Sequence, residues 1–229
     1  MNSTELKAMA AVAWAAELRD GMVVGLGSGS TAKLVVDAIG VRVKGGLKII
    51  GIPTSEATAE QAAGLGIPLS TLGEYPRVDV TIDGADEVEL GTLNLIKGGG
   101  GNQLREKIVA AASSRFIVTI DESKLVDHLG DQRKVPVEVA QFGWQSTARS
   151  LTKLSGVPEL RTTADGKAFV TDGGNYILDC AFGRIASAEG LQRELDSVVG
   201  VVEHGLFIGM AALIVIGAPA GVRRMERIA

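Results

Sequence analysis

Hydrophobic positions in the first 130 residues fall into short continuous runs that alternate with longer mixed stretches. The runs predict buried β-strands, because a strand covered on both faces needs no alternation of polar residues. The mixed stretches place apolar residues at helical spacing, as Leu6, Met9 and Ala13 show near the N-terminus. Strands are predicted at 22–26, 47–52, 78–82 and 115–120, and helices at 3–19, 31–39, 55–63 and 102–113. This alternation indicates a mostly parallel sheet with helices on both faces.

The rhythm of the pattern changes after about residue 130. Short apolar runs now surround two predicted helices, and the turn at 172–175 indicates a hairpin between 169–171 and 176–181. The predicted strands are 135–139, 159–162, 169–171, 176–181 and 201–207, and the predicted helices are 144–154 and 188–198. The uncharged stretch 205–222 contains Pro219 and several glycines, so it predicts a buried strand at 213–216 and not a membrane-spanning helix.

The pattern as a whole predicts an α/β fold. We expect an open, mostly parallel Rossmann-like sheet with an inserted small α+β domain of the ferredoxin-like type. The main domain is expected at residues 1–130 and 205–229, and the inserted domain at residues 131–204.

Composition narrows the class of function. The 229 residues are 46% hydrophobic and 22% charged, which suits a globular protein with a substantial core. Only 4% are aromatic and the net charge is −4, which argues against a nucleic-acid surface. The single cysteine, Cys180, excludes an internal disulfide, fits a reducing compartment and predicts a small buried side chain. Residues 1–20 mix charges with alanines, unlike a secretory signal, so we expect a cytoplasmic protein without a membrane partner.

A glycine- and hydroxyl-rich segment, Gly27-Ser28-Gly29-Ser30-Thr31, joins the first predicted strand to a helix. The free amides and the positive dipole end of such a helix can hold an anion, and the hydroxyl groups add donors. Neither the dinucleotide fingerprint nor a Walker motif is complete here. The alternative is a tight turn with a capping serine. The hydroxyl-rich segment Thr54-Ser55 is explained at least as well by helix capping.

An acidic run, Asp83-Gly84-Ala85-Asp86-Glu87, follows the predicted strand at 78–82. It therefore lies at the carboxyl end of that strand, the edge where open α/β sheets bind ligands. It has three interpretations: a divalent-metal site, an acid/base pair, or a charged turn. The chain has only two histidines, which weakens the metal interpretation, although Mg²⁺ binds carboxylates alone. Asp83 is the best candidate because it leaves the strand first.

A second run places Lys97 before four glycines, Gly98–Gly101, and Glu106 follows in the next predicted helix. Four glycines are costly to order, which favours a loop that a ligand approaches closely. A carboxylate base, a cation and an amide-rich loop suit proton abstraction beside a carbonyl, where the developing enediolate oxygen needs stabilisation. Taken singly, Glu106 is also explained by the helix dipole and Lys97 by solvation. Lys124 follows another predicted strand. It is interpreted equally well as a residue that binds a ligand at the same sheet edge and as a surface lysine.

These motifs, in this order, resemble ribose-5-phosphate isomerase of the A type. The segments that carry the resemblance are 27–32, 54–58, 83–87, 97–101, 104–107, 121–124 and 204–207. The resemblance implies interconversion of ribose 5-phosphate and ribulose 5-phosphate in the pentose phosphate pathway, without a metal or nucleotide cofactor. It also implies that Glu106 moves a proton between C2 and C1, that Asp83 assists ring opening with Asp86 nearby, and that Lys97 steadies oxygen charge.

The resemblance further implies a substrate site. Its lining residues would be Ser28, Gly29, Ser30, Thr31, Asp83, Gly84, Ala85, Asp86, Lys97, Gly98, Gly99, Gly100 and Lys124. Many family members have threonine where Ser28 stands, so a hydroxyl group is retained. The inserted domain is expected to cover the site and to help form a homodimer or homotetramer.

Two other functions remain as alternatives. A sugar-phosphate sensor of the same fold would carry a basic helix-turn-helix segment, which the sequence lacks. A CoA or acyl transferase on a related sheet would use a glutamate as its nucleophile.

Overall fold

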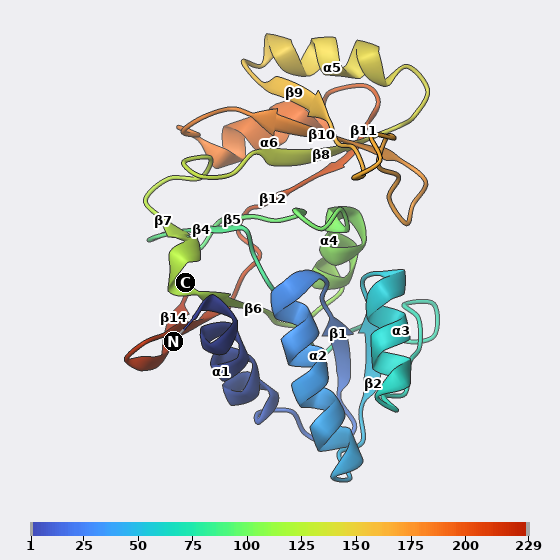
Figure 1. Ribbon diagram of the computed structural model, residues 1–229, viewed down its shortest axis with the longest axis vertical. Helices are drawn as coiled ribbons and strands as arrows, with labels where there is room; N and C mark the ends of the chain where they lie inside the picture. Colours follow the sequence, from blue (N-terminus) through green and yellow to red (C-terminus); the bar gives the residue numbers. More distant parts are fainter. Residues whose placement is uncertain (1, 228–229) are drawn as a thin grey trace. The chain divides into compact units, whose positions relative to one another are not determined.

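The computed structural model describes residues 2–227, which fall into two units (Figure 1). Unit 1 comprises residues 2–85, 105–124 and 210–227, and unit 2 comprises residues 86–104 and 125–209. None of the helices within residues 2–227 has both the length and the apolar character needed to cross a membrane.

Unit 1 is built on a six-stranded sheet with the strand order β14-β13-β6-β3-β1-β2. Its strands are β1 (Val23–Leu26), β2 (Ile50–Pro53), β3 (Val80–Asp83), β6 (Phe116–Asp121), β13 (Leu213–Ala218) and β14 (Gly221–Glu226). The first five are parallel, and β14 pairs antiparallel with β13. In chain order the parallel strands run 2-1-3-4-5, the flavodoxin-like form of the doubly wound fold. The predicted Rossmann-like sheet is confirmed.

Helices cover both faces of this sheet, as predicted. They are α1 (Ser3–Ala15), α2 (Gly29–Lys44), α3 (Glu56–Gly64) and α4 (Gln103–Ala111), whose first two residues belong to unit 2. One core contains Val24 and Leu26 of β1 together with side chains of α1 and α2. A second core joins Val23, on the opposite face of β1, to Val109 of α4. The burial of both faces explains why the strands read as continuous apolar runs.

Unit 2 contains a βαββαβ motif. Its elements are β8 (Val135–Val139), α5 (Trp144–Lys153), β9 (Val157–Leu160), β10 (Tyr176–Ala181), α6 (Ala188–Asp196) and β11 (Val201–His204). The antiparallel strands lie in the order β11-β8-β10-β9, and a buried cluster that includes Leu151, Leu178 and Leu195 joins the helices to them. This element order is that of a ferredoxin-like domain, as predicted.

A second small sheet in unit 2 was not predicted. It has the order β12-β5-β4-β7, with β4 (Glu87–Glu89), β5 (Leu95–Ile96), β7 (Leu125–Val126) and β12 (Leu206–Phe207). These strands are too short to show periodicity, and β7 and β12 are distant in the sequence from the strands with which they pair. Because β4 and β5 pair in this sheet, residues 86–104 belong to unit 2. The predicted boundaries at 130/131 and 204/205 place residues 86–104 in the main domain instead. That these boundaries separate two folding domains stays a prediction.

Two predicted strands differ from those observed. Residues 169–171 form no strand, and β10 pairs with β8 and β9, so the predicted hairpin is wrong. The turn itself is present, since the Gly174 amide donates to the Thr171 carbonyl at 2.9 Å. The predicted strand 201–207 breaks at Gly205, where a Cβ would lie 2.1 Å from the Lys97 carbonyl oxygen. There the chain passes from the sheet of β11 to the sheet of β12.

Candidate active site

The parallel sheet of unit 1 has a switch point between β1 and β3. The connection from β1 leads through α2 to β2 on one side, whereas β3 lies on the other side of β1. In doubly wound sheets ligands bind at the carboxyl ends of the strands that flank such a point. The glycine loop Gly27–Thr31 follows β1 here, and Asp83 is the last residue of β3. The predicted placement of Asp83 at the carboxyl end of its strand is confirmed, and the glycine loop lies at the same edge of the sheet.

The glycine loop packs directly against Asp83. The Gly27 amide donates to the Ile82 carbonyl at 2.9 Å, and the Ser28 amide donates to Asp83 Oδ1 at 3.1 Å. Asp83 Oδ1 also accepts the Gly84 amide at 2.7 Å. A Cβ on residue 27 would lie 2.3 Å from the Asp83 carboxyl carbon, so only glycine permits this approach. Asp83 is fully buried and fixed in orientation.

Ser28 occupies the N-cap position of α2, as the interpretation as an N-cap serine predicted. Its side chain makes no capping hydrogen bond, and its hydroxyl instead meets the Thr54 hydroxyl at 2.6 Å. Gly29, with φ 87°, and Ser30 are exposed at the first turn of the helix. The first turn therefore remains suited to an external anion, which the dipole of α2 favours.

The second hydroxyl-rich segment supports the loop from behind. Ser55 caps α3 by accepting the Thr58 amide at 3.0 Å, which confirms the capping interpretation for this serine. The Thr58 hydroxyl donates to the Gly27 carbonyl at 3.0 Å, and the Thr54 hydroxyl donates to the Leu26 carbonyl at 3.1 Å. The start of α3 thus fixes the backbone of the glycine loop.

Glu106 lies in the first turn of α4 and is only 4% exposed. Its neighbour Arg105 behaves differently and forms an ion pair with the exposed Glu56 at 2.8 Å. Keeping a carboxylate out of water costs free energy, which a dipole interaction at the surface would not require. Surface dipole pairing alone therefore does not account for Glu106.

The end of β6 carries a second buried carboxylate, Asp121. It accepts the Ser3 hydroxyl and the Ser123 amide, each at 3.0 Å, and lies 3.5 Å from the Lys7 ammonium. Burial raises the pKa of Asp121, but the hydrogen bonds and the lysine outweigh it and hold the pKa below its usual value. These contacts anchor α1 at the carboxyl edge of the sheet. Lys124 is the half-buried last residue of the 3-10 helix η1 (Glu122–Lys124) that follows.

In unit 2 the predicted run begins with Lys97, directly after β5. This lysine is only 2% exposed, so its interpretation as a solvated surface residue is wrong. Its backbone amide donates to the Gly205 carbonyl at 2.8 Å, and its ammonium lies 5.4 Å from the centre of the Phe207 ring. The segment 204–207 therefore holds Lys97 from both its backbone and its side chain.

Three of the four glycines after Lys97 are required by their surroundings. Gly98 and Gly101 have φ of 98° and 83°, which disfavours other residues. A Cβ on Gly99 would lie 2.8 Å from Asp86, whose Oδ2 accepts the Gly99 amide at 2.8 Å. Gly100 differs: it is exposed, and the atom nearest to an added Cβ is 3.7 Å away.

The residues of the acidic run each make different contacts. Asp83 holds the first glycine loop and Asp86 the second, and the half-buried Ala85 is the last residue of the first segment of unit 1. A Cβ on Gly84 would lie 3.2 Å from the Thr31 Cβ. Glu87 is buried and accepts three loop amides, from Gly130, Gln132 and Arg133, at 2.6 to 2.7 Å. Glu87 therefore stabilises the loop before β8.

One group of side chains in the described part of the chain has ligand atoms close enough to hold a metal ion: Asp196, Glu203 and His204. The imidazole of His204 is already engaged on both nitrogens. Its Nδ1 accepts the Leu206 amide at 3.2 Å, and its Nε2 lies 3.1 Å from Asp196 Oδ1. The geometry describes a structural histidine, and the acidic run is not part of this group.

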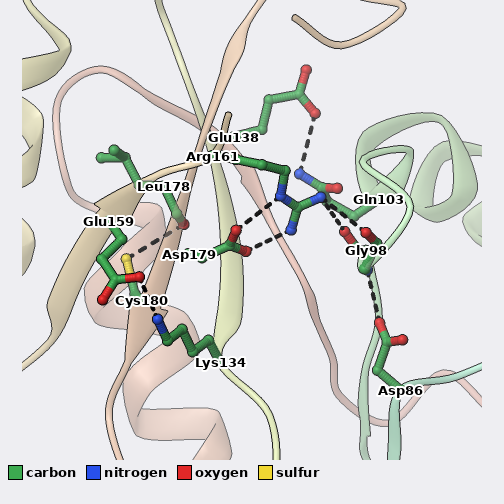
Figure 2. A network of polar contacts seen from close by, with 11 residues as sticks. Asp86, Gly98, Gln103, Lys134, Glu138, Glu159, Arg161, Leu178, Asp179 and Cys180 are labelled. Atoms are coloured by element: carbon green, nitrogen blue, oxygen red, sulfur yellow. Dashed lines mark hydrogen bonds and ion pairs between the residues drawn. The ribbon is translucent and has the colours of Figure 1, made fainter. Parts of the chain in front are cut away.

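The sequence did not predict Arg161, which contacts the second glycine loop, or Asp179, which binds Arg161 (Figure 2). It also missed Gln103, whose amide donates to the buried Glu138 at 3.4 Å. No local signal reveals these residues, because Arg161 follows β9, Asp179 lies on β10, and Gln103 is next to a motif without belonging to it. Cys180 is buried as predicted, and burial raises the pKa of its thiol to about 12.

The sequence and structure match one family throughout. The family model of ribose 5-phosphate isomerase A (phosphoriboisomerase A) matches residues 50–221. Ribose-5-phosphate isomerase A of Synechococcus sp. (strain JA-3-3Ab) is 53% identical over 227 residues, 99% of each chain. That of Gloeobacter violaceus is 57% identical over 205 residues, 90% of this chain and 89% of the relative. A solved D-ribose-5-phosphate isomerase in complex with phospho-erythronic acid has a TM-score of 0.96 at 37% identity, covering 99% of this chain and all of that one.

Proposed function

Because this chain belongs to the ribose 5-phosphate isomerase A family, we propose that Glu106, Asp83 and Lys97 carry out its isomerisation of ribose 5-phosphate to ribulose 5-phosphate. The observation that carries this assignment is burial. The three charged side chains are 0 to 4% exposed, although charged groups are costly to remove from water. Buried charged groups of this kind are enriched at functional sites.

Asp83 and Glu106 have separate proton transfers in this proposal. Asp83 assists opening of the furanose ring by moving the proton of the O1 hydroxyl to the ring oxygen. Glu106 then removes the C2 proton of the open-chain aldose, and the electrons move to O1 as the enediolate forms. The conjugate acid of Glu106 returns the proton to C1. The proton of the O2 hydroxyl passes to O1, and C2 becomes the ketone carbon.

The other predicted residues bind the substrate in this proposal. The first turn of α2, in which Gly29 and Ser30 are exposed and Thr31 is buried, suits the phosphate group, and Lys124 supplies a positive charge. The ammonium of Lys97 and the amides of Gly98–Gly100 suit the oxygens on which negative charge grows. Gly84, Ala85 and Asp86 follow Asp83 in the chain, and Asp86 binds the Gly99 amide of the second glycine loop. The identity of whole-length relatives favours the isomerase over a sensor or an acyl transferase.

We expect the reaction to need no metal ion. Proton transfer by Glu106 and charge stabilisation by Lys97 and backbone amides leave no step that requires one. The measurement is ketose formation from ribose 5-phosphate before and after dialysis against EDTA. An unchanged rate is the expected result. Activity that disappears with the chelator and returns with Mg²⁺ would restore a metal role for the acidic run.

We further propose a homodimer or homotetramer that works in the cytoplasm. Phe142 and Val199 of unit 2 are large apolar side chains that are 99% and 92% exposed, and contact with a second chain would remove them from water. The expected result of light scattering after size-exclusion chromatography is a mass of two or four chains of 23.8 kDa. A single-chain mass at working concentration would contradict the proposal.

A further inference from the structure

Arg161 connects the ferredoxin-like sheet of unit 2 to the glycine loop after Lys97 (Figure 2). Its Nε and Nη2 donate to the two carboxylate oxygens of Asp179, at 2.9 and 2.5 Å. Its Nη1 donates to the carbonyl oxygens of Gly98 and Gly99, at 3.1 Å each. The side chain is only 15% exposed. Asp179 therefore fixes the plane of the guanidinium group and directs its remaining edge at the loop.

These contacts fix the direction of two peptide groups. In a trans peptide the carbonyl and the N–H point in opposite directions. The peptide between Gly98 and Gly99 is held on both sides, since its oxygen accepts from Arg161 and its N–H donates to Asp86 at 2.8 Å. The peptide between Gly99 and Gly100 also turns its oxygen to Arg161. The Gly100 N–H therefore points away from Arg161, at an exposed residue.

A run of glycines needs such a clamp. Glycine has the widest choice of backbone conformations, so a free loop of this kind would present its amides in many directions. Donors stabilise a developing charge best when their direction is set before the reaction. Phe169 adds to the clamp, because its ring lies 5.8 Å from the Arg161 guanidinium carbon and an added Cβ on Gly101 would lie 2.6 Å from it.

We propose that Arg161 is a positioning residue for the isomerisation. By holding the Gly98 and Gly99 carbonyls, it directs the Gly100 amide at the substrate oxygen that gains negative charge in the enediolate. Arg161 does not itself touch the substrate, and Asp179 acts by orienting Arg161. The inference rests on the proposed function, in which this loop binds the substrate.

The test is the Arg161→Lys variant, assayed with ribose 5-phosphate. Lysine keeps the positive charge, but a single ammonium group cannot reproduce the fork that bonds Asp179 and two carbonyls together. We expect kcat to fall about 10²-fold, the effect of misplacing a catalytic donor, with a much smaller change in KM. Asp179→Asn, which leaves the loop contacts in place but loses the charge that orients Arg161, is expected to show a smaller fall.

The control is Lys134→Gln. Lys134 lines the same cavity of about 240 Å³ as Asp86, Gly99 and Arg161, but its ion pair is with the exposed Glu159. An exposed ion pair of this kind contributes little to stability, so its loss should change kcat less than about twofold. Parental kcat in a folded Arg161→Lys protein would overturn the inference, as would a lower melting temperature with unchanged kcat. If the Arg161→Lys variant does not fold, a parental kcat in Asp179→Asn would overturn the inference instead. A parent enzyme that forms no ketose would instead contradict the proposed function.

Discussion

The Glu106→Gln variant is expected to lose kcat by about 10²- to 10⁴-fold while it still binds ribose 5-phosphate. Glutamine keeps the size of the side chain and its ability to hydrogen-bond, but it cannot take a proton from carbon. Because the lost interaction belongs to the transition state, KM should change far less than kcat. Steady-state assays of ketose formation give both constants, and calorimetric titration with phospho-erythronate measures binding without turnover.

The matched control for this variant is Glu56→Gln. Glu56 is a carboxylate of the same unit that is exposed and forms its ion pair with Arg105, the residue before Glu106. Its replacement removes the same charge without touching the proposed base. Equal losses in the two variants would mean that unit 1 depends on net charge and not on a base at position 106.

The second large effect is expected for Lys97→Met. Methionine fills much of the same buried space beside Phe207 but removes the ammonium group. The loss of one group that stabilises the enediolate oxygen should lower kcat by about 10²- to 10³-fold. Stopped assays of the purified variant measure this effect, and circular dichroism shows whether the fold is retained.

Lys153→Met serves as the control for the loss of positive charge. Lys153 lies at the end of α5 in the same unit and is exposed, in contrast to the buried Lys97. We expect its kcat to match the parent. A folded Lys97→Met enzyme with parental kcat would remove Lys97 from the mechanism and leave charge stabilisation to the amides.

The sequence predicts the elements that rest on local pattern. Strands β1, β3 and β6 are buried on both faces, so each appears as a short, mostly apolar run. Their lengths of four to six residues favour strands over helices. The two-residue strands β5, β7 and β12 carry no periodicity and exist only through partners elsewhere in the chain. Strand β14 was missed for another reason: its residues are largely exposed at the edge of the sheet.

The candidate site divides in the same way. The Gly27–Thr31 loop and Asp83 could be placed together from sequence, because both follow parallel strands and such strands end at one edge. The burial of Lys97 was not foreseen, since it depends on Gly205 and Phe207 more than a hundred residues later. The role of Arg161 was not predicted either, because its contacts are with Gly98 and Gly99, more than sixty residues earlier. That Asp83, Lys97 and Glu106 act on one bound substrate stays a prediction, which the two variants above test.

The most direct test of the central claim is deuterium exchange in D₂O. Over many turnovers the parent enzyme should introduce deuterium at C2 of recovered ribose 5-phosphate and at C1 of ribulose 5-phosphate, because the carboxyl proton of Glu106 exchanges with solvent. NMR of the recovered sugars should show this incorporation for the parent and for Glu56→Gln, and a loss of about 10²-fold or more in its rate for Glu106→Gln. Incorporation by Glu106→Gln at the parental rate would contradict the account.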